Sequence, residues 1–142
     1  MATSRETARD ALTTLLDAGL TTKQEVVGHK LADPAGKSPI VAVLSAGTLR
    51  QRLTFQGTRP TFYLTIQVLV LAEDQAGYTE ADAEDTLDTV ESEIAAVLED
   101  NWRTSSWESL EQTGPSEVID VSIGGVAYYL EEIPVAMSLA TS

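Results

Sequence analysis

The stretch that decides the fold is Phe62-Tyr63-Leu64-Thr65-Ile66-Gln67-Val68-Leu69-Val70, near the middle of the sequence. Apolar side chains occupy every second position, and the polar or amphipathic residues Tyr63, Thr65 and Gln67 fall between them. A period of two is typical of a β-strand with one buried face. From Val68 to Leu71 every position is apolar, which predicts that this end of the strand is central in a sheet.

The residues before this stretch predict its partner strand. Leu49, Leu53 and Phe55 alternate with Arg50, Arg52 and Thr54, and residues 56–60 (Gln-Gly-Thr-Arg-Pro) have the composition of a turn. The pattern therefore predicts a long β-hairpin that carries Arg50 and Arg52 on its outer side. Two shorter strands are predicted upstream, over residues 25–30 and over the apolar run from Ile40 to Leu44.

Two helices are predicted on either side of these strands. The first spans residues 4–18, with Thr3 and Glu6 spaced as a capping box and Gly19 as the stop. The second spans about residues 80–100 and begins after Thr79, which can cap it. Each has an apolar stripe at helical spacing. The opposite face of the second helix carries acids and no base, and this favours a positively charged partner.

The last third of the chain predicts a second hairpin. Gly124 and Gly125 form its two-residue turn, and pairing Ile123 with Val126 sets Tyr128 opposite Val121 and Leu130 opposite Ile119. Beyond Leu130 the apolar residues move to odd positions, which predicts a bulge at Glu131-Glu132. Pro134 predicts that this part of the strand lies at a sheet edge or faces outward.

Charge divides the sequence into two parts. Residues 1–59 hold eight Lys and Arg and five Asp and Glu, a net charge of +3. Residues 60–142 hold Arg103 and seventeen acids, a net charge of −16. The acidic part would be repelled by a nucleic-acid backbone. The 142 residues contain no repeat and no linker, so we expect one domain over residues 1–142 and, with no long apolar stretch, no membrane anchor.

The sequence argues against catalysis. It has no cysteine, which excludes disulfides, thiolate metal sites and cysteine nucleophiles, and His29 is the only histidine. No phosphate-binding loop, dinucleotide fingerprint, calcium loop or nucleophile elbow is present. We therefore expect no enzyme activity, no catalytic residue, no metal and no cofactor.

Three segments and the order of elements resemble the tail terminator (tail completion) proteins of long-tailed bacteriophages. The segments are Ser38-Pro39-Ile40-Val41-Ala42-Val43, the run from Phe62 to Val70 that leads into the helix at Ala81 to Val90, and Gly125-Val126-Ala127-Tyr128-Tyr129. The resemblance spans nearly the whole chain. It implies an α+β fold in which a small antiparallel or mixed β-sheet with a long β-hairpin is packed on one face by two helices.

The resemblance also implies a structural role in the virion, at the tail–neck junction. Before assembly, such a protein is in the host cytoplasm. Such proteins form a ring, usually a hexamer, on the last ring of tail tube protein. The ring ends tube polymerisation and joins the tail to the head–tail connector or neck protein. DNA passes through its lumen only as cargo, and no membrane is involved.

The divided charge independently suits a ring, in which one patch of a subunit meets a different patch of its neighbour. We hypothesise that Arg50, Arg52 and Arg59 approach acids of a neighbouring subunit or of the tube, and that Glu84, Asp88 and Glu91 form an acidic interface. The alternative is that all of these are solvated surface charges. Three other functions stay open: a neck or head-closure protein of related fold, an acidic DNA-mimic inhibitor, and a small hydrolase.

Overall fold

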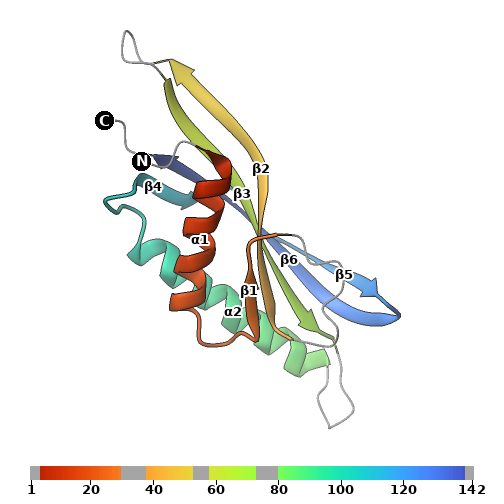
Figure 1. Ribbon diagram of the computed structural model, residues 1–142. Helices are drawn as coiled ribbons and strands as arrows, with labels where there is room; N and C mark the ends of the chain where they lie inside the picture. Colours follow the sequence, from red (N-terminus) through yellow and green to blue (C-terminus); the bar gives the residue numbers. More distant parts are fainter. Residues whose placement is uncertain (1–3, 30–37, 53–57, 73–79, 140–142) are drawn as a thin grey trace.

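The computed structural model describes residues 4–29, 38–52, 58–72 and 80–139, and it has the predicted α+β class (Figure 1). Its elements follow in the order α1 (Arg5–Gly19), β1 (Glu25–Val27), β2 (Ile40–Arg52), β3 (Thr58–Leu71), α2 (Glu80–Asp100), β4 (Trp107–Gln112), β5 (Glu117–Ile123) and β6 (Val126–Leu139). Thr3 and Thr79, the two residues predicted to cap the helices, lie outside the described residues, as do Leu53 and Phe55.

Within the described residues, six strands form one mixed sheet in the order β1-β2-β3-β6-β4, and β5 also pairs with β6. Among these strands β1 and β2 are parallel, and the other pairs are antiparallel. β4 and β5 lie one after the other along the same side of β6, since Gln112 pairs with Val135 and Glu117 with Glu132. Sequence reasoning missed β4, because the segment around Trp107 has no clear alternation.

Both helices contribute to one large apolar cluster with the strands. Phe62, Leu64, Ile66, Val68 and Val70 on β3 are essentially fully buried in it, and so are residues of α1, α2, β2, β4 and β6. These even-numbered β3 residues point to one face because side chains alternate along a strand. We call this side of the sheet the helix face, since both helices pack there (Figure 1).

A smaller cluster lies on the opposite face and explains why the apolar pattern of β6 changes phase. Tyr128 packs there with Ile40 and Leu69, and Leu130 lies against them. Ile133, Val135 and Met137 face the helix side. The pairing of β6 with β3 runs without a shift through Glu131 and Glu132. The predicted bulge is therefore wrong: a regular strand contributes to one cluster with its first half and to the other with its second.

Of the two alternatives predicted for Pro134, a sheet edge is wrong, because β6 has a strand on each side. The residue does face outward, since it pairs with Thr65 on the face of the sheet away from the helices. The carbonyl of Pro134 accepts a hydrogen bond from the Thr113 N–H, in the connection between β4 and β5. In an antiparallel strand the N–H and C=O of one residue point to the same side. The missing N–H of Pro134 therefore faces the break between β4 and β5, so its pairing with β3 is intact.

A bulge occurs instead in β2, between Ser45 and Gly47. The two segments predicted around Leu44 and Leu49 are thus one thirteen-residue strand. The extra residue reverses the alternation, so that Thr48 pairs with Phe62 and Arg50 with Pro60 on the helix face. Without the bulge, Leu49 would face the helices; with it, Leu49 is 45% exposed on the other face. Arg50 and Arg52 lie on the helix side and not on the predicted outer side.

The ends of α1 differ from the predicted ones. Ser4 is the N-cap, and its hydroxyl accepts a 3.2 Å hydrogen bond from the Thr7 N–H. The helix includes Gly19, and the following residue, Leu20, is extended. A Cβ at Gly19 would lie 2.7 Å from Cγ2 of Val97 on α2. Glycine is therefore needed there for the close approach of the two helices.

Candidate functional site

Arginines from two elements gather on one surface. Arg5 and Arg9 are on α1, and Arg50 and Arg52 are on the far end of β2. Nη1 of Arg5 donates to the Thr48 hydroxyl at 3.2 Å, and Nη1 of Arg9 donates to the Ser45 hydroxyl at 2.9 Å. These contacts hold the first turns of α1 against the part of β2 that follows Val43. We call these four arginines the basic surface. No pattern in the sequence predicts that Arg5 and Arg9 belong to it.

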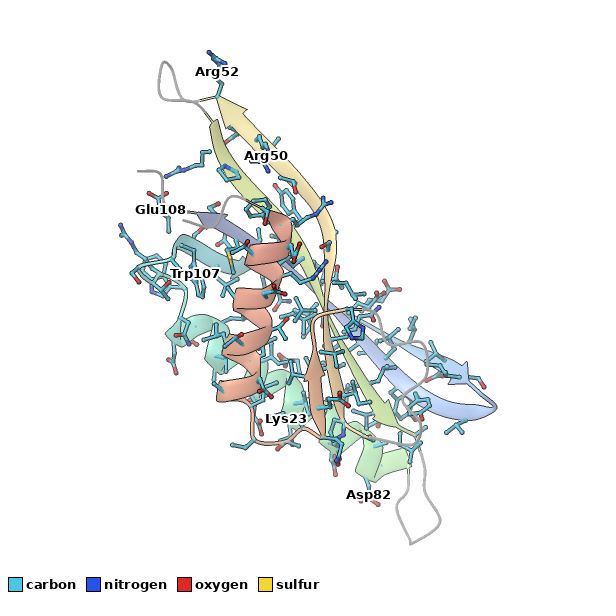
Figure 2. The ribbon with its side chains drawn as sticks, in the orientation of Figure 1. Lys23, Arg50, Arg52, Asp82, Trp107 and Glu108 are labelled. Carbon is cyan, nitrogen blue, oxygen red and sulfur yellow. The ribbon has the colours of Figure 1, made fainter. Side chains whose placement is uncertain are left out.

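The far end of the β2–β3 hairpin projects beyond the rest of the sheet. β1 pairs with β2 only at residues 40–42, and the described pairing of β6 with β3 begins at Thr61. Residues 48–52 and 58–60 thus pair only with each other among the described strands. The guanidinium of Arg50 lies 5.6 Å from the ring centroid of the fully buried Phe62, at the root of this projection. Arg52 is exposed at its end (Figure 2).

The third predicted interface arginine has a different environment. Arg59 faces away from the helices, and its guanidinium forms an ion pair with Glu108 at the start of β4. This pair links β3 to β4 within one chain. Its two side chains are each about a third exposed. A role for Arg59 at an interface stays a prediction, whereas Arg50 and Arg52 are placed on the projecting end.

The predicted acids Glu84 and Asp88 line a groove with a volume of about 410 Å³. Its other lining residues are Leu87 of the same helix, Val118 and Asp120 of β5, and Tyr129 of β6. We call this the acidic groove. Three of its six lining residues carry carboxylates, and Val118 is 53% exposed. Sequence reasoning missed Asp120 and Tyr129, because the predicted pairing of β5 with β6 sets them side by side but does not show that they line a groove with α2.

A buried carboxyl group lies beside the groove. Glu131 pairs with Val118 across β5 and β6 and is 4% exposed. Burial raises the pKa of Glu131, a 2.6 Å hydrogen bond from the Ser116 hydroxyl lowers it in part, and the charges of Glu91 and Asp88 raise it again. Glu91, the third predicted acid, is half-buried on α2. Its charge contributes to the raised pKa of Glu131. The region concentrates negative charge against a low-dielectric core.

We expect Glu131→Gln to stabilise the protein at pH 7 by on the order of 1 kcal/mol, because it removes a buried charge and keeps a hydrogen-bond acceptor for Ser116. The folded pKa of Glu131 is raised, so its destabilising charge forms as the pH rises through that pKa. Below about pH 4, where the group is protonated in both states, the two proteins should be equally stable. Urea denaturation at pH 4 and pH 7 measures this, and equal stability at both pH values would contradict it.

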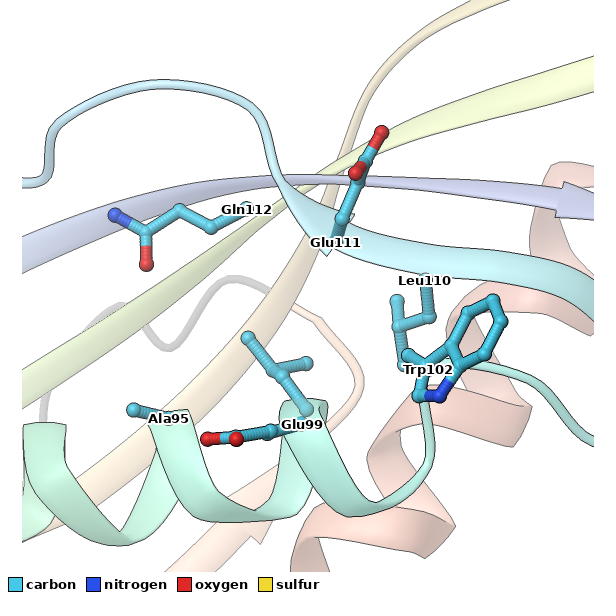
Figure 3. Close-up of a pocket in the computed structure, with 7 residues that line it drawn as sticks. Ala95, Glu99, Trp102, Leu110, Glu111 and Gln112 are labelled. Atoms are coloured by element: carbon cyan, nitrogen blue, oxygen red, sulfur yellow. The ribbon is translucent and has the colours of Figure 1, made fainter.

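A second concave site lies between the end of α2 and β4 (Figure 3). It has a volume of about 250 Å³ and is lined by Ala95, Leu98, Glu99, Trp102, Leu110, Glu111 and Gln112. The indole of Trp102 is 55% exposed there, whereas Trp107 is buried and donates from Nε1 to the Asn101 carbonyl at 2.8 Å. The two tryptophans thus differ: Trp107 anchors the core and Trp102 covers a shallow surface hollow.

The basic surface and the acidic half of α2 lie at opposite ends of the molecule. Figure 2 shows Arg50 and Arg52 on the projecting hairpin at one end and Asp82, in the first turn of α2, at the other. The acidic groove adjoins the same first half of α2. The two surfaces therefore cannot meet within one chain. The geometry offers two complementary charged surfaces.

Other kinds of site find no support in the residues that the structure describes. No group of three or more His, Asp or Glu within them is placed to hold a metal ion. His29 is exposed just after β1. No helix in this part of the chain is long and apolar enough to cross a membrane.

Neither a protein-family model nor a curated protein sequence matches this chain.

Proposed function

We propose that this protein is a tail terminator of a long-tailed bacteriophage: a structural virion protein, not an enzyme, whose copies form a ring on the tail tube. The ring, a hexamer, ends tube polymerisation and joins the tail to the head–tail connector. The observation that carries the proposal is the separation of the basic surface from the acidic groove at opposite ends of one small chain. Such a chain suits head-to-tail association, which gives a ring when the rotation between neighbouring copies closes on itself.

Two further features support this proposal. The finer fold that goes with it is a long β-hairpin on a sheet packed on one face by two helices, and β2, β3 and the helix-face cluster fit that description. The charge also fits a ring through which DNA passes as cargo. With seventeen acids after residue 59, a subunit can turn negative charge toward the lumen, where DNA would be repelled and would not adhere.

The experiment adds the purified protein to tail tube protein while the tube polymerises, and follows tube length by electron microscopy. We expect tubes to stop growing and to carry a ring at one end. Tubes that grow to the same length with and without the protein would contradict the proposal. Binding to the head–tail connector but not to tube protein would favour a neck or head-closure protein of related fold.

A further inference from the structure

We infer that the projecting hairpin of one copy docks into the acidic groove of a second copy, with Arg50 and Arg52 facing Glu84, Asp88 and Asp120. The inference deepens the proposed function by naming the contact between ring subunits, and it rests on that function only in requiring that copies of this chain assemble. The occupant of the groove is thus a second copy of the same chain.

Charge complementarity selects this occupant. The groove has three carboxylates and, among the residues that the structure describes, no basic lining residue; Arg103 is the only Lys or Arg of the chain after residue 59. Lys23 lies toward the same end of the molecule as Asp82 but pairs with Asp17 and does not line the groove, whereas Arg50 and Arg52 lie at the other end. Arg50 and Arg52 therefore cannot reach the acidic groove of their own chain, whereas the hairpin of a neighbouring copy can.

The chemistry of the groove suits arginine. The three carboxylates can accept paired hydrogen bonds from the planar guanidinium fork. Leu87, Val118 and Tyr129 line the same groove and provide apolar surface against which the methylene stem of an arginine can pack. Tyr129 also offers an aromatic ring to a cation. Val118 is 53% exposed in the single chain, so docking would remove apolar surface from water as well as pair charges.

The projecting hairpin suits insertion. Its end has no described strand neighbour beyond its own two strands. The described contacts of this end with other elements are the hydrogen bond from Arg5 to Thr48 and the ion pair of Arg59 with Glu108, and neither involves Arg52. The contact uses different patches on the two copies, so each copy still has one free hairpin and one free groove until a ring closes.

The test uses two charge-reversal variants, R50E/R52E and E84R/D88R, with mass measured in solution by light scattering at low salt. Wild type should assemble. Each variant alone should have a dissociation constant at least about 100-fold higher and remain monomeric, because its hairpin and groove then carry like charge. A 1:1 mixture of the two variants should assemble again, since each contact between different variants pairs opposite charges. Circular dichroism should show that both variants are folded.

A matched control, D85R/D100R, makes the same change in net charge on exposed positions of α2 outside the groove, and should assemble as wild type does. The inference is overturned if wild type stays monomeric at the highest concentration tested, if either variant assembles alone, or if the mixture stays monomeric. The experiment with tail tube protein tests the proposed function separately from this contact. A ring that assembles by another contact and still stops tube growth would overturn this inference and leave the proposed function standing.

Discussion

Replacing Phe62 with alanine is expected to lower the free energy of unfolding by about 3–5 kcal/mol, the range for truncating a buried aromatic side chain. Phe62 is fully buried on the helix face and belongs to the large cluster shared by both helices. It also lies where the hairpin leaves the body of the sheet, beneath the guanidinium of Arg50. A loss of this size is a large part of the 5–15 kcal/mol that usually stabilises a domain.

Urea denaturation monitored by tryptophan fluorescence measures this loss. Phe62→Leu is the matched control, since it keeps most of the volume and should cost about 1 kcal/mol. If Phe62→Ala lost less than 1 kcal/mol, the hairpin root would have to collapse into the vacated space, and Phe62 would not be the anchor of the projection.

Replacing Glu93 with alanine is expected to cost about 2–3 kcal/mol, because one carboxylate serves four donors. Oε1 accepts from the backbone N–H groups of Thr21 and Thr22, each at 2.9 Å, and Oε2 accepts from their hydroxyls at 3.2 and 2.6 Å. Glu93 thereby ties the segment after α1 to α2. Glu93→Gln should lose an intermediate amount, since its amide NH₂ cannot accept. Glu99→Ala, exposed at the end of the same helix, should change stability by less than about 0.5 kcal/mol.

The contribution of Glu93 should depend on pH with a definite sign. Desolvation raises the pKa of Glu93, but the hydrogen bonds from Thr22 and Thr21 together outweigh it, so the pKa lies below its usual value of 4.5. The carboxylate therefore stabilises the fold above about pH 4.5, and this contribution disappears as the pH falls through the folded pKa. Denaturation midpoints of wild type and Glu93→Ala should converge in acid. If wild type and Glu93→Ala differed in stability by the same amount down to the lowest pH, the ionised carboxylate of Glu93 would not be the source of the stabilisation.

The periodic segments were predictable because their signals are local. The alternation from Phe62 to Val70 became β3, the stripe of residues 80–100 became α2 with those bounds, and Gly124-Gly125 became the turn that sets the predicted register of β5 and β6. Both glycines have positive φ, 61° and 80°, which other residues adopt only at a cost. Apolar spacing and backbone freedom act over a few residues, so they can be read without the rest of the chain.

The sequence-based predictions were wrong where both faces of the sheet carry apolar clusters, or where segments far apart in the chain pack together. The change of phase in β6 predicted a bulge at Glu131, yet it follows from a second apolar cluster on the other face of the sheet. The real bulge, between Ser45 and Gly47, decides which side Arg50 occupies, and it has no periodic signal of its own. Glycine often follows the end of a helix, so the sequence predicts a helix stop at Gly19. It cannot show how closely Val97 approaches this residue.

The sequence by itself determined the class of the fold, the bounds of the long acidic helix, the absence of cysteine chemistry and the division of charge along the chain. Only the tertiary structure decided how that charge is distributed in space. It set Arg5 and Arg9 beside Arg50, paired Arg59 with Glu108, and brought Asp120 opposite Glu84 and Asp88 across a groove. Each of these arrangements depends on strand register and helix packing between segments far apart in the chain, which no local pattern encodes.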